Sequence, residues 1–187
     1  MDPDDKKLVT DFLEGDSEAL GGLLERYLNL VYRFAFRITR DSHDAEDVTQ
    51  ATFIKVWHNL HKFDVEKNFR TWLLSIAHNS AIDLLRKRKS FVFSDFDTLE
   101  GGNSITDALP DPTPLPPEIF SRAEDKKFLD SALSELSPAF QEILILHHEE
   151  GLTFSEISSI VSKPLNTVKS QYRRALLTLR RNLEQPR

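Results

Sequence analysis

The chain has 187 residues, 40% of them hydrophobic, with no cysteine and a formal net charge of −6. This length suits one ordinary domain or two small ones, and the apolar content is enough for folded cores. The absence of cysteine excludes disulfides and thiolate metal or redox chemistry. No apolar run approaches the roughly 18 residues of a membrane span. The acidic start MDPDDKK is no signal peptide, so we expect a soluble cytoplasmic protein.

The charge is distributed unevenly along the chain. Residues 69–90 carry a net charge of +4 and residues 163–187 carry +6, whereas residues 91–121 carry −6. Attraction to phosphate depends on a local patch and not on the total charge. Two separate contacts with DNA are therefore compatible with an acidic chain.

Apolar residues recur at helical spacing in the N-terminal part, and no run alternates long enough to predict a strand. The spacing predicts a short helix that contains Leu8 and Leu13 and ends near Gly15, which can adopt the left-handed conformation of a helix end. It also predicts a longer helix from about Ser17 to Arg40. We expect an all-α protein whose N-terminal domain is a four-helix bundle.

A third helix is predicted to begin at a cap on Ser42 or Asp44 and to end near Leu60. Its buried stripe is expected to consist of four apolar side chains, at Phe53, Val56, Trp57 and Leu60. Its early turns expose three polar side chains, at Glu46, Asp47 and Gln50. These side chains either only complement the positive end of the helix or meet a basic partner.

A fourth helix, FRTWLLSIAHNSAIDLLRKRK, is predicted at 69–89, with Asn68 as its cap. One face is apolar, whereas the other carries Trp72, Ser75, Asn79 and Arg86 and leads into the basic run Arg86, Lys87, Arg88 and Lys89. An indole, an amide and phosphate-seeking charge together are typical of single-stranded nucleic-acid binding. The alternative is that Trp72 is a core residue and that the basic run is a solvated helix end.

The composition changes after Ser90. Residues 91–121 hold five of the nine prolines and six acidic residues, with no Lys or Arg. Such a segment cannot offset its ordering entropy by burial, so an extended acidic linker is predicted. The expected organisation is a domain at 1–90, the linker at 91–121 and a second domain at 122–187.

The second domain is predicted to be helical. One helix is expected from about Pro117 to Leu136, and the next has Ser137 as its cap and Pro138 at its first position, and ends before Gly151. Adjacent side chains near that end are the chain's candidates for metal ligands or acid and base groups: His147, His148, Glu149 and Glu150. They lack the i, i+4 spacing of two ligands on one helix face. We therefore predict a solvated helix end, no catalytic residue, no metal or cofactor and no small-molecule substrate.

A short helix, a four-residue turn and a long basic helix complete the chain. Thr153 and Glu156 form a capping box for a helix at 153–161, and Asn166 is expected to cap a last helix at 167–183. This order is typical of a helix-turn-helix whose second helix enters the major groove. Candidate base-reading and phosphate-binding residues are Thr167, Lys169, Ser170, Gln171, Arg173 and Arg174. The alternative is a solvated basic helix in a plain bundle.

Two blocks of sequence, in this order, resemble the extracytoplasmic-function (ECF) sigma factors of bacteria. The residues DAEDVTQATFIKVWHNLHKF with FRTWLLSIAHNSAIDLLRKRK are similar to the second conserved region of that family, and EGLTFSEISSIVSKPLNTVKSQYRRALLTLR is similar to the fourth. The resemblance implies a subunit that binds core RNA polymerase and directs it to promoter DNA, and is not itself an enzyme. It also implies an anti-sigma factor as a partner, without insertion of this chain into a membrane.

The resemblance further implies roles for single residues. Contact with the polymerase clamp is expected from Glu46, Asp47 and Gln50. Contact with the minus-ten element is expected from Phe63, Phe69, Trp72, Asn79, Arg86, Lys87 and Arg88, with the loop at 63–68 and Asn79 capturing a base flipped from the melted non-template strand. The last helix is expected to read the duplex minus-thirty-five element.

A stand-alone helix-turn-helix regulator is the alternative function. In that case residues 1–90 would be a dimerisation or sensing module, and the chain would bind duplex operators unaided. A sigma factor instead is expected to have negligible promoter affinity without core polymerase.

Overall fold

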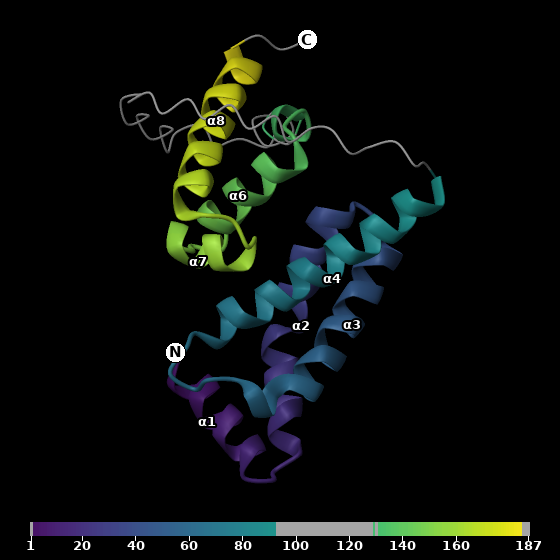
Figure 1. The fold of residues 1–187 in the computed structure, drawn as a ribbon, viewed down its shortest axis with the longest axis vertical. Helices are drawn as coiled ribbons and strands as arrows, with labels where there is room; N and C mark the ends of the chain where they lie inside the picture. The colour runs from purple at the N-terminus through teal and green to yellow at the C-terminus, as the bar shows by residue number, and fades with distance from the viewer. Residues whose placement is uncertain (1, 93–128, 130, 185–187) are drawn as a thin grey trace. The chain divides into compact units, whose positions relative to one another are not determined.

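The computed structural model describes residues 2–92, 129 and 131–184. Its elements are α1 (Pro3–Leu13), α2 (Glu18–Thr39), α3 (Ser42–Asn59), the 3-10 turn η1 (Leu60–Lys62), α4 (Phe69–Val92), α6 (Pro138–His148), α7 (Phe154–Ile160) and α8 (Leu165–Glu184), as Figure 1 shows. No strand occurs in these described ranges, so the all-α prediction is confirmed. None of the described helices is both long and apolar enough to cross a bilayer.

The chain forms two compact units, each of which is described by itself. The first contains α1 to α4, and the second contains α6 and α8. Two small helical domains were predicted, and this is confirmed. The predicted linker at 91–121 lies outside the described residues except for Phe91 and Val92, which continue α4. The helix predicted at 117–136 is described only in part, where residues 131–134 are helical.

In the first unit, α2 packs against α1, α3 and α4. Small side chains allow α2, α3 and α4 to approach closely, because Ala35, Ala45 and Ala81 are fully buried in one cluster with Val48. Gly22 serves the same purpose between α1 and α2, since a Cβ atom there would lie 2.9 Å from Leu8 Cδ2. Close packing of these helices fixes the spacing between α3 and α4, which carry the candidate site.

The start of α3 differs from the prediction. Its N-cap is Asp41, whose side chain accepts a hydrogen bond from the Asp44 N–H at 2.9 Å, so neither Ser42 nor Asp44 is the cap. Asp44 is buried and forms an ion pair with Arg88 of α4. The predicted cap of α4 is confirmed, because Asn68 Oδ1 accepts from the Thr71 N–H at 3.2 Å.

In the second unit, α6 packs against α8. The buried cluster consists of Ala132, Leu136, Leu144, Ala175, Leu176 and Leu179. Ser137 and Pro138 occupy the predicted first positions of α6. The predicted cap of the last helix is wrong, because α8 already begins at Leu165 and Asn166 lies within its first turn. There the Pro164 carbonyl accepts from the Val168 N–H at 3.1 Å, which continues the helical hydrogen bonding one turn earlier.

Candidate nucleic-acid interface

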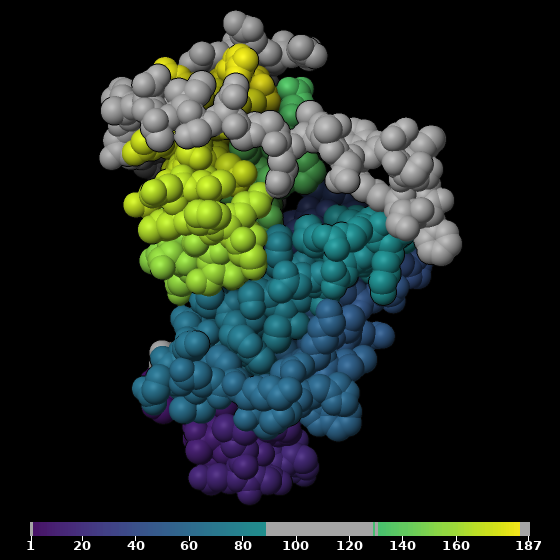
Figure 2. Space-filling model, in the orientation of Figure 1, coloured from purple at the N-terminus to yellow at the C-terminus, as the bar shows by residue number. Residues whose placement is uncertain are grey.

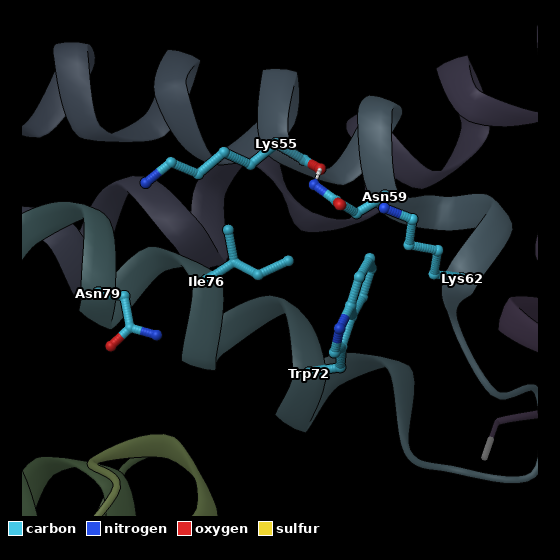
Figure 3. A pocket seen from close by; sticks show the side chains of 6 residues that line it. All are labelled: Lys55, Asn59, Lys62, Trp72, Ile76 and Asn79. Carbon is cyan, nitrogen blue, oxygen red and sulfur yellow. Dashed lines mark hydrogen bonds between the residues drawn. The ribbon is translucent and has the colours of Figure 1, made fainter.

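A pocket of about 330 Å³ lies between α3, η1 and α4 in the first unit (Figure 3). One wall is a stripe on α4, formed by Trp72, Ile76 and Asn79. The facing wall is formed by Lys55, Asn59 and Lys62. Both sets follow the i, i+4, i+7 spacing of one helix face. The pocket therefore brings the predicted Trp72 and Asn79 together with three polar residues, Lys55, Asn59 and Lys62, that were not among the predicted site residues.

One hydrogen bond joins α3 to α4 beside the pocket, and two others lie within the single helices. Lys55 Nζ donates to Ser80 Oγ at 2.9 Å, and Ser80 Oγ donates to the Ile76 carbonyl at 2.8 Å. Asn59 Nδ2 donates to the Lys55 carbonyl at 2.8 Å (Figure 3), and this bond holds the Asn59 amide in place. Lys55 thus links α3 to α4 and leaves further N–H donors on its ammonium group, which carries three.

Two buried aromatic rings support Trp72 from behind. The centroids of Phe63 and Phe69 lie 4.8 and 5.8 Å from that of Trp72. Phe69 is 0% exposed and Phe63 is 7% exposed, so the prediction that both contact DNA is wrong. Trp72 itself is half-buried and lines the pocket. One side of the indole therefore packs in the core, as the alternative interpretation predicted, and the other side is open to the pocket.

The basic end of α4 lies beyond the pocket-lining residues. Arg86 and Lys87 are exposed there. The Arg88 guanidinium pairs with the buried carboxylate of Asp44, and thereby ties the end of α4 to the start of α3. Arg88 therefore has a structural role, and because its side chain is still 59% exposed, its predicted contact with DNA stays a prediction.

Replacing Arg88 with alanine is expected to destabilise the protein by about 1 to 3 kcal/mol, because Asp44 would remain buried without its cation. The loss stays at the lower part of the range for buried pairs since Arg88 is largely exposed and screened. Urea unfolding measures the difference. Lys87→Ala is the matched control, with an expected change within about 0.5 kcal/mol. Equal effects of the two substitutions would contradict the role of the ion pair.

A second surface lies on the outer side of α3. Glu46, Asp47 and Gln50 are exposed, as predicted for a partner contact. Ile54 and Trp57 continue the stripe of Asp47 and Gln50, and both are 55% exposed. The prediction of Trp57 as core is wrong, because its indole stacks on His58 with centroids 4.9 Å apart at the surface. In the space-filling view, α3 and α4 make up most of the visible face of the first unit, and the N-terminal residues form its lower end (Figure 2).

The exposed side of α8 carries most of the predicted base-reading residues. Lys169, Ser170 and Arg174 are exposed, whereas Thr167 and Arg173 are half-buried. Gln171 differs, because its Oε1 atom is buried and has no hydrogen-bond partner among the described residues. A bidentate contact with adenine needs both the oxygen and the nitrogen of the amide. In this side-chain arrangement Gln171 cannot make that bidentate contact, and its predicted role in reading a base stays a prediction.

An aromatic cluster joins the end of α6 to α8. Tyr172 Oη and His148 Nε2 are 3.0 Å apart, and His147 Nδ1 is 2.8 Å from the Leu152 carbonyl oxygen. The His147 ring also stacks on Phe154 with centroids 4.5 Å apart. In the part of the chain that the structure describes, no three His, Asp or Glu side chains are placed to hold a metal ion. Both imidazoles contact Tyr172, and these contacts join the end of α6 to α8.

This cluster predicts a pH dependence of stability. Burial, followed by the charge of His147, lowers the pKa of His148 below its ordinary value. His148 therefore stabilises the fold above the unfolded-state pKa of about 6.5, and this contribution is lost as the pH falls through the folded-state pKa. The melting temperature of wild type should fall more steeply between pH 7.5 and 5 than that of His148→Gln, which keeps a polar partner for Tyr172. Parallel curves for the two proteins would contradict this contribution.

The chain is similar to known proteins over most of its length. Family models match residues 23–91, described as Sigma-70 region 2, and residues 129–179, described as Sigma-70, region 4. ECF RNA polymerase sigma factor SigW of Bacillus subtilis is 28% identical over 180 residues, which cover 95% of this chain and 96% of that protein. ECF RNA polymerase sigma factor SigE of Mycolicibacterium smegmatis is 30% identical over 185 residues, covering 96% and 69%.

A solved structure supports the fold. The sigma factor RpoE of Bartonella quintana, in complex with the anti-sigma factor NepR, matches 91% of this chain and 99% of its own, with a TM-score of 0.66 and 24% identity. At this identity the likeness concerns the arrangement of the helices.

Proposed function

The chain belongs to the ECF family of RNA polymerase sigma factors, and from this premise we propose which of its surfaces meet the polymerase and the promoter. As a sigma factor it binds core RNA polymerase and directs promoter-specific initiation in the cytoplasm. It acts as a specificity subunit and not as a catalyst. The pocket between α3 and α4 captures a base from the melted minus-ten element, and α8 reads the minus-thirty-five element.

The pocket carries the minus-ten proposal. It combines the open side of an indole with amide and ammonium groups, which suit stacking and hydrogen bonding to one unstacked base. Extruding a base costs a few kcal/mol, and stacking on an aromatic side chain returns about 1–3 kcal/mol per base. Hydrogen bonds from Lys55 and Asn79 supply the remainder. The exposed Arg86 and Lys87 lie further along α4 and hold phosphates of the same strand.

The outer stripe of α3 is proposed as the polymerase contact. Asp47 and Gln50 offer polar groups to the clamp, with Glu46 beside them, and Ile54 and Trp57 add an apolar anchor. A buried aromatic anchor within a polar rim is the usual composition of an energetic hot spot. This stripe and the pocket use different sides of α3, so both contacts can be made at the same time.

The exposed side of α8 is proposed to lie in the major groove. Arg174 can pair bidentately with guanine, and Lys169, Ser170, Arg173 and Thr167 then position the helix on bases and phosphates. The acidic linker remains proposed at 91–121, between domains at 1–90 and 122–187. An anti-sigma factor is a proposed partner, as RpoE of Bartonella quintana is bound to NepR.

An abasic scan tests the base-capture proposal. Each non-template nucleotide of the minus-ten element is replaced in turn by an abasic analogue, and open-complex formation with core polymerase and this chain is followed by permanganate reactivity. One position should show a loss of about tenfold or more, the equivalent of 1.4 kcal/mol or above. Equal, small effects at every position would overturn capture of a single base.

A further inference from the structure

A continuous row of aromatic rings runs from α2 to the pocket. The centroid of Tyr27 lies 5.5 Å from that of Phe69, which in turn lies 5.8 Å from that of Trp72. Phe63 closes the row, at 5.6 Å from Phe69 and 4.8 Å from Trp72. Only Trp72 among these four lines the pocket, and the other three are buried. The orientation of the pocket's indole is thus set by rings that no base can reach.

The far end of this row is anchored by a buried polar pair. Tyr27 Oη donates to Asp5 Oδ2 of α1 at 2.5 Å, and Arg26 Nε lies 3.1 Å from Asp5 Oδ1. Asp5 is 2% exposed and Tyr27 is 7% exposed. Burial and the hydrogen bond to Asp5 raise the pKa of Tyr27, so the phenol stays protonated as the donor. Asp2 and Asp4 pair with the same guanidinium, at 2.6 and 3.2 Å.

Stability alone does not explain why a phenol and a carboxylate are buried together at this place. Well-packed apolar residues are often as stabilising as a buried ionic group of the same volume. An apolar ring at position 27 could rotate or slide within its contacts, whereas a phenol bonded to a fixed carboxylate has one position. Because Phe69 packs directly on Tyr27, a fixed Tyr27 also limits the movement of Phe69 and of the indole beyond it.

Helix α1 also reaches the loop at the edge of this row. Lys6 Nζ of α1 lies 2.8 Å from Glu66 Oε1, in the loop that joins η1 to α4. Both side chains are largely exposed, so this pair contributes little energy. It nevertheless places α1 against the same loop that carries Phe63. Two separate contacts of α1, at Asp5 and at Lys6, therefore converge on the support of Trp72.

We propose that Tyr27, held by Asp5, is a positioning residue for base capture, which sets the orientation of the Trp72 indole through Phe69. This role rests on the proposed capture of a minus-ten base by the pocket. Stacking depends on the plane and the height of the aromatic face, and small displacements of a supporting shell reduce it. Helix α1 is accordingly a functional brace of the pocket as well as a part of the bundle.

The test uses the full chain with core polymerase. The rate of open-complex formation is measured on two promoters, one with the captured base and one with an abasic analogue at that position. The ratio of the two rates gives the factor by which the captured base speeds open-complex formation. Tyr27→Phe should lower this ratio about three- to tenfold, or 0.7 to 1.4 kcal/mol, while the rate on the abasic promoter stays that of wild type. Thr52→Val is the matched control, because it removes another buried hydroxyl, bonded to the Val48 carbonyl at 2.7 Å, and should leave the ratio unchanged.

The outcomes separate this inference from the proposed function. A wild-type ratio of one would overturn both, whereas a large wild-type ratio that Tyr27→Phe leaves intact would overturn the positioning role alone. A second readout is the acrylamide quenching of Trp72 in a Trp57→Phe background, which Tyr27→Phe should increase and Thr52→Val should not. If Tyr27→Phe does not fold, Asp5→Asn replaces the charged acceptor of the phenol with a weaker, neutral one and should give an intermediate ratio. An unchanged ratio in Asp5→Asn would overturn the role as well.

Discussion

Replacing Trp72 with alanine is expected to slow open-complex formation by about ten- to a hundredfold, because a stacked base is worth ~1–3 kcal/mol. The open side of the indole lines the pocket, whereas its other side packs on Phe63 and Phe69. Affinity for core polymerase should stay within about twofold, since Trp72 belongs to α4 and the polymerase contact is assigned to a side of α3 that does not line the pocket. Permanganate footprinting measures melting, and anisotropy of a labelled chain measures polymerase binding.

Two further variants distinguish stacking from support of the core. Trp72→Phe keeps an aromatic face and should recover most of the rate. Asn79→Ala alters an exposed side chain of the same pocket, so it should slow melting without a change in the melting temperature of the protein. If Trp72→Ala lowered polymerase affinity and melting equally, or simply unfolded the chain, the indole would be a core residue and the pocket assignment would be wrong.

Replacing Trp57 with alanine is expected to weaken binding to core polymerase by about thirtyfold, the equivalent of 2 kcal/mol for an aromatic hot spot. The side chain is 55% exposed and adds nothing to the buried stripe of α3, so the melting temperature should change little. Competition against a labelled wild-type chain gives the affinity.

The matched control for Trp57 is Leu28→Ala. Leu28 is also apolar and largely exposed, at 48%, but belongs to α2, which carries none of the residues assigned to the contact. It should bind core polymerase like wild type. Equal affinities of Trp57→Ala and Leu28→Ala would remove Trp57 from the interface and leave its exposure without a function.

The two tryptophans show what helical spacing can and cannot predict. Helical spacing predicted α3 and α4 correctly, and the bounds of these two helices differ from the prediction by only a few residues. Trp57 was assigned to the core and proved exposed, whereas Trp72 was assigned to the open face and proved half-buried. Both lie at the boundary between an apolar and a polar arc, where the side that a residue faces is decided by the neighbouring helix and not by its own.

The polar wall of the pocket required tertiary information for the same reason. Lys55, Asn59 and Lys62 share one helical spacing, which is visible in the sequence. Nothing local indicates that this stripe faces Trp72 and Asn79, and in isolation it is indistinguishable from a solvated face. Asp44 and Arg88 are likewise separated by more than forty residues, so their pairing followed only from the packing of α3 on α4.

The predicted helix caps were wrong where several neighbouring residues could serve as the N-cap. Asp41, Ser42 and Asp44 are all favourable at an N-cap, and propensity alone does not rank three candidates within one turn. In the structure Asp41 is the cap and the buried Asp44 is used for Arg88. Helix α8 begins one residue before Asn166, since the Val168 N–H already donates to the Pro164 carbonyl.

We expect this chain to recognise promoters only together with core RNA polymerase. The direct measurement is binding to one promoter duplex, and transcription from it, by the chain alone, by core polymerase alone and by both. Specific transcripts and protection of the minus-ten and minus-thirty-five regions are expected only when both proteins are present. Tight, sequence-specific binding of the duplex by the purified chain alone would contradict it, and would identify a stand-alone regulator instead.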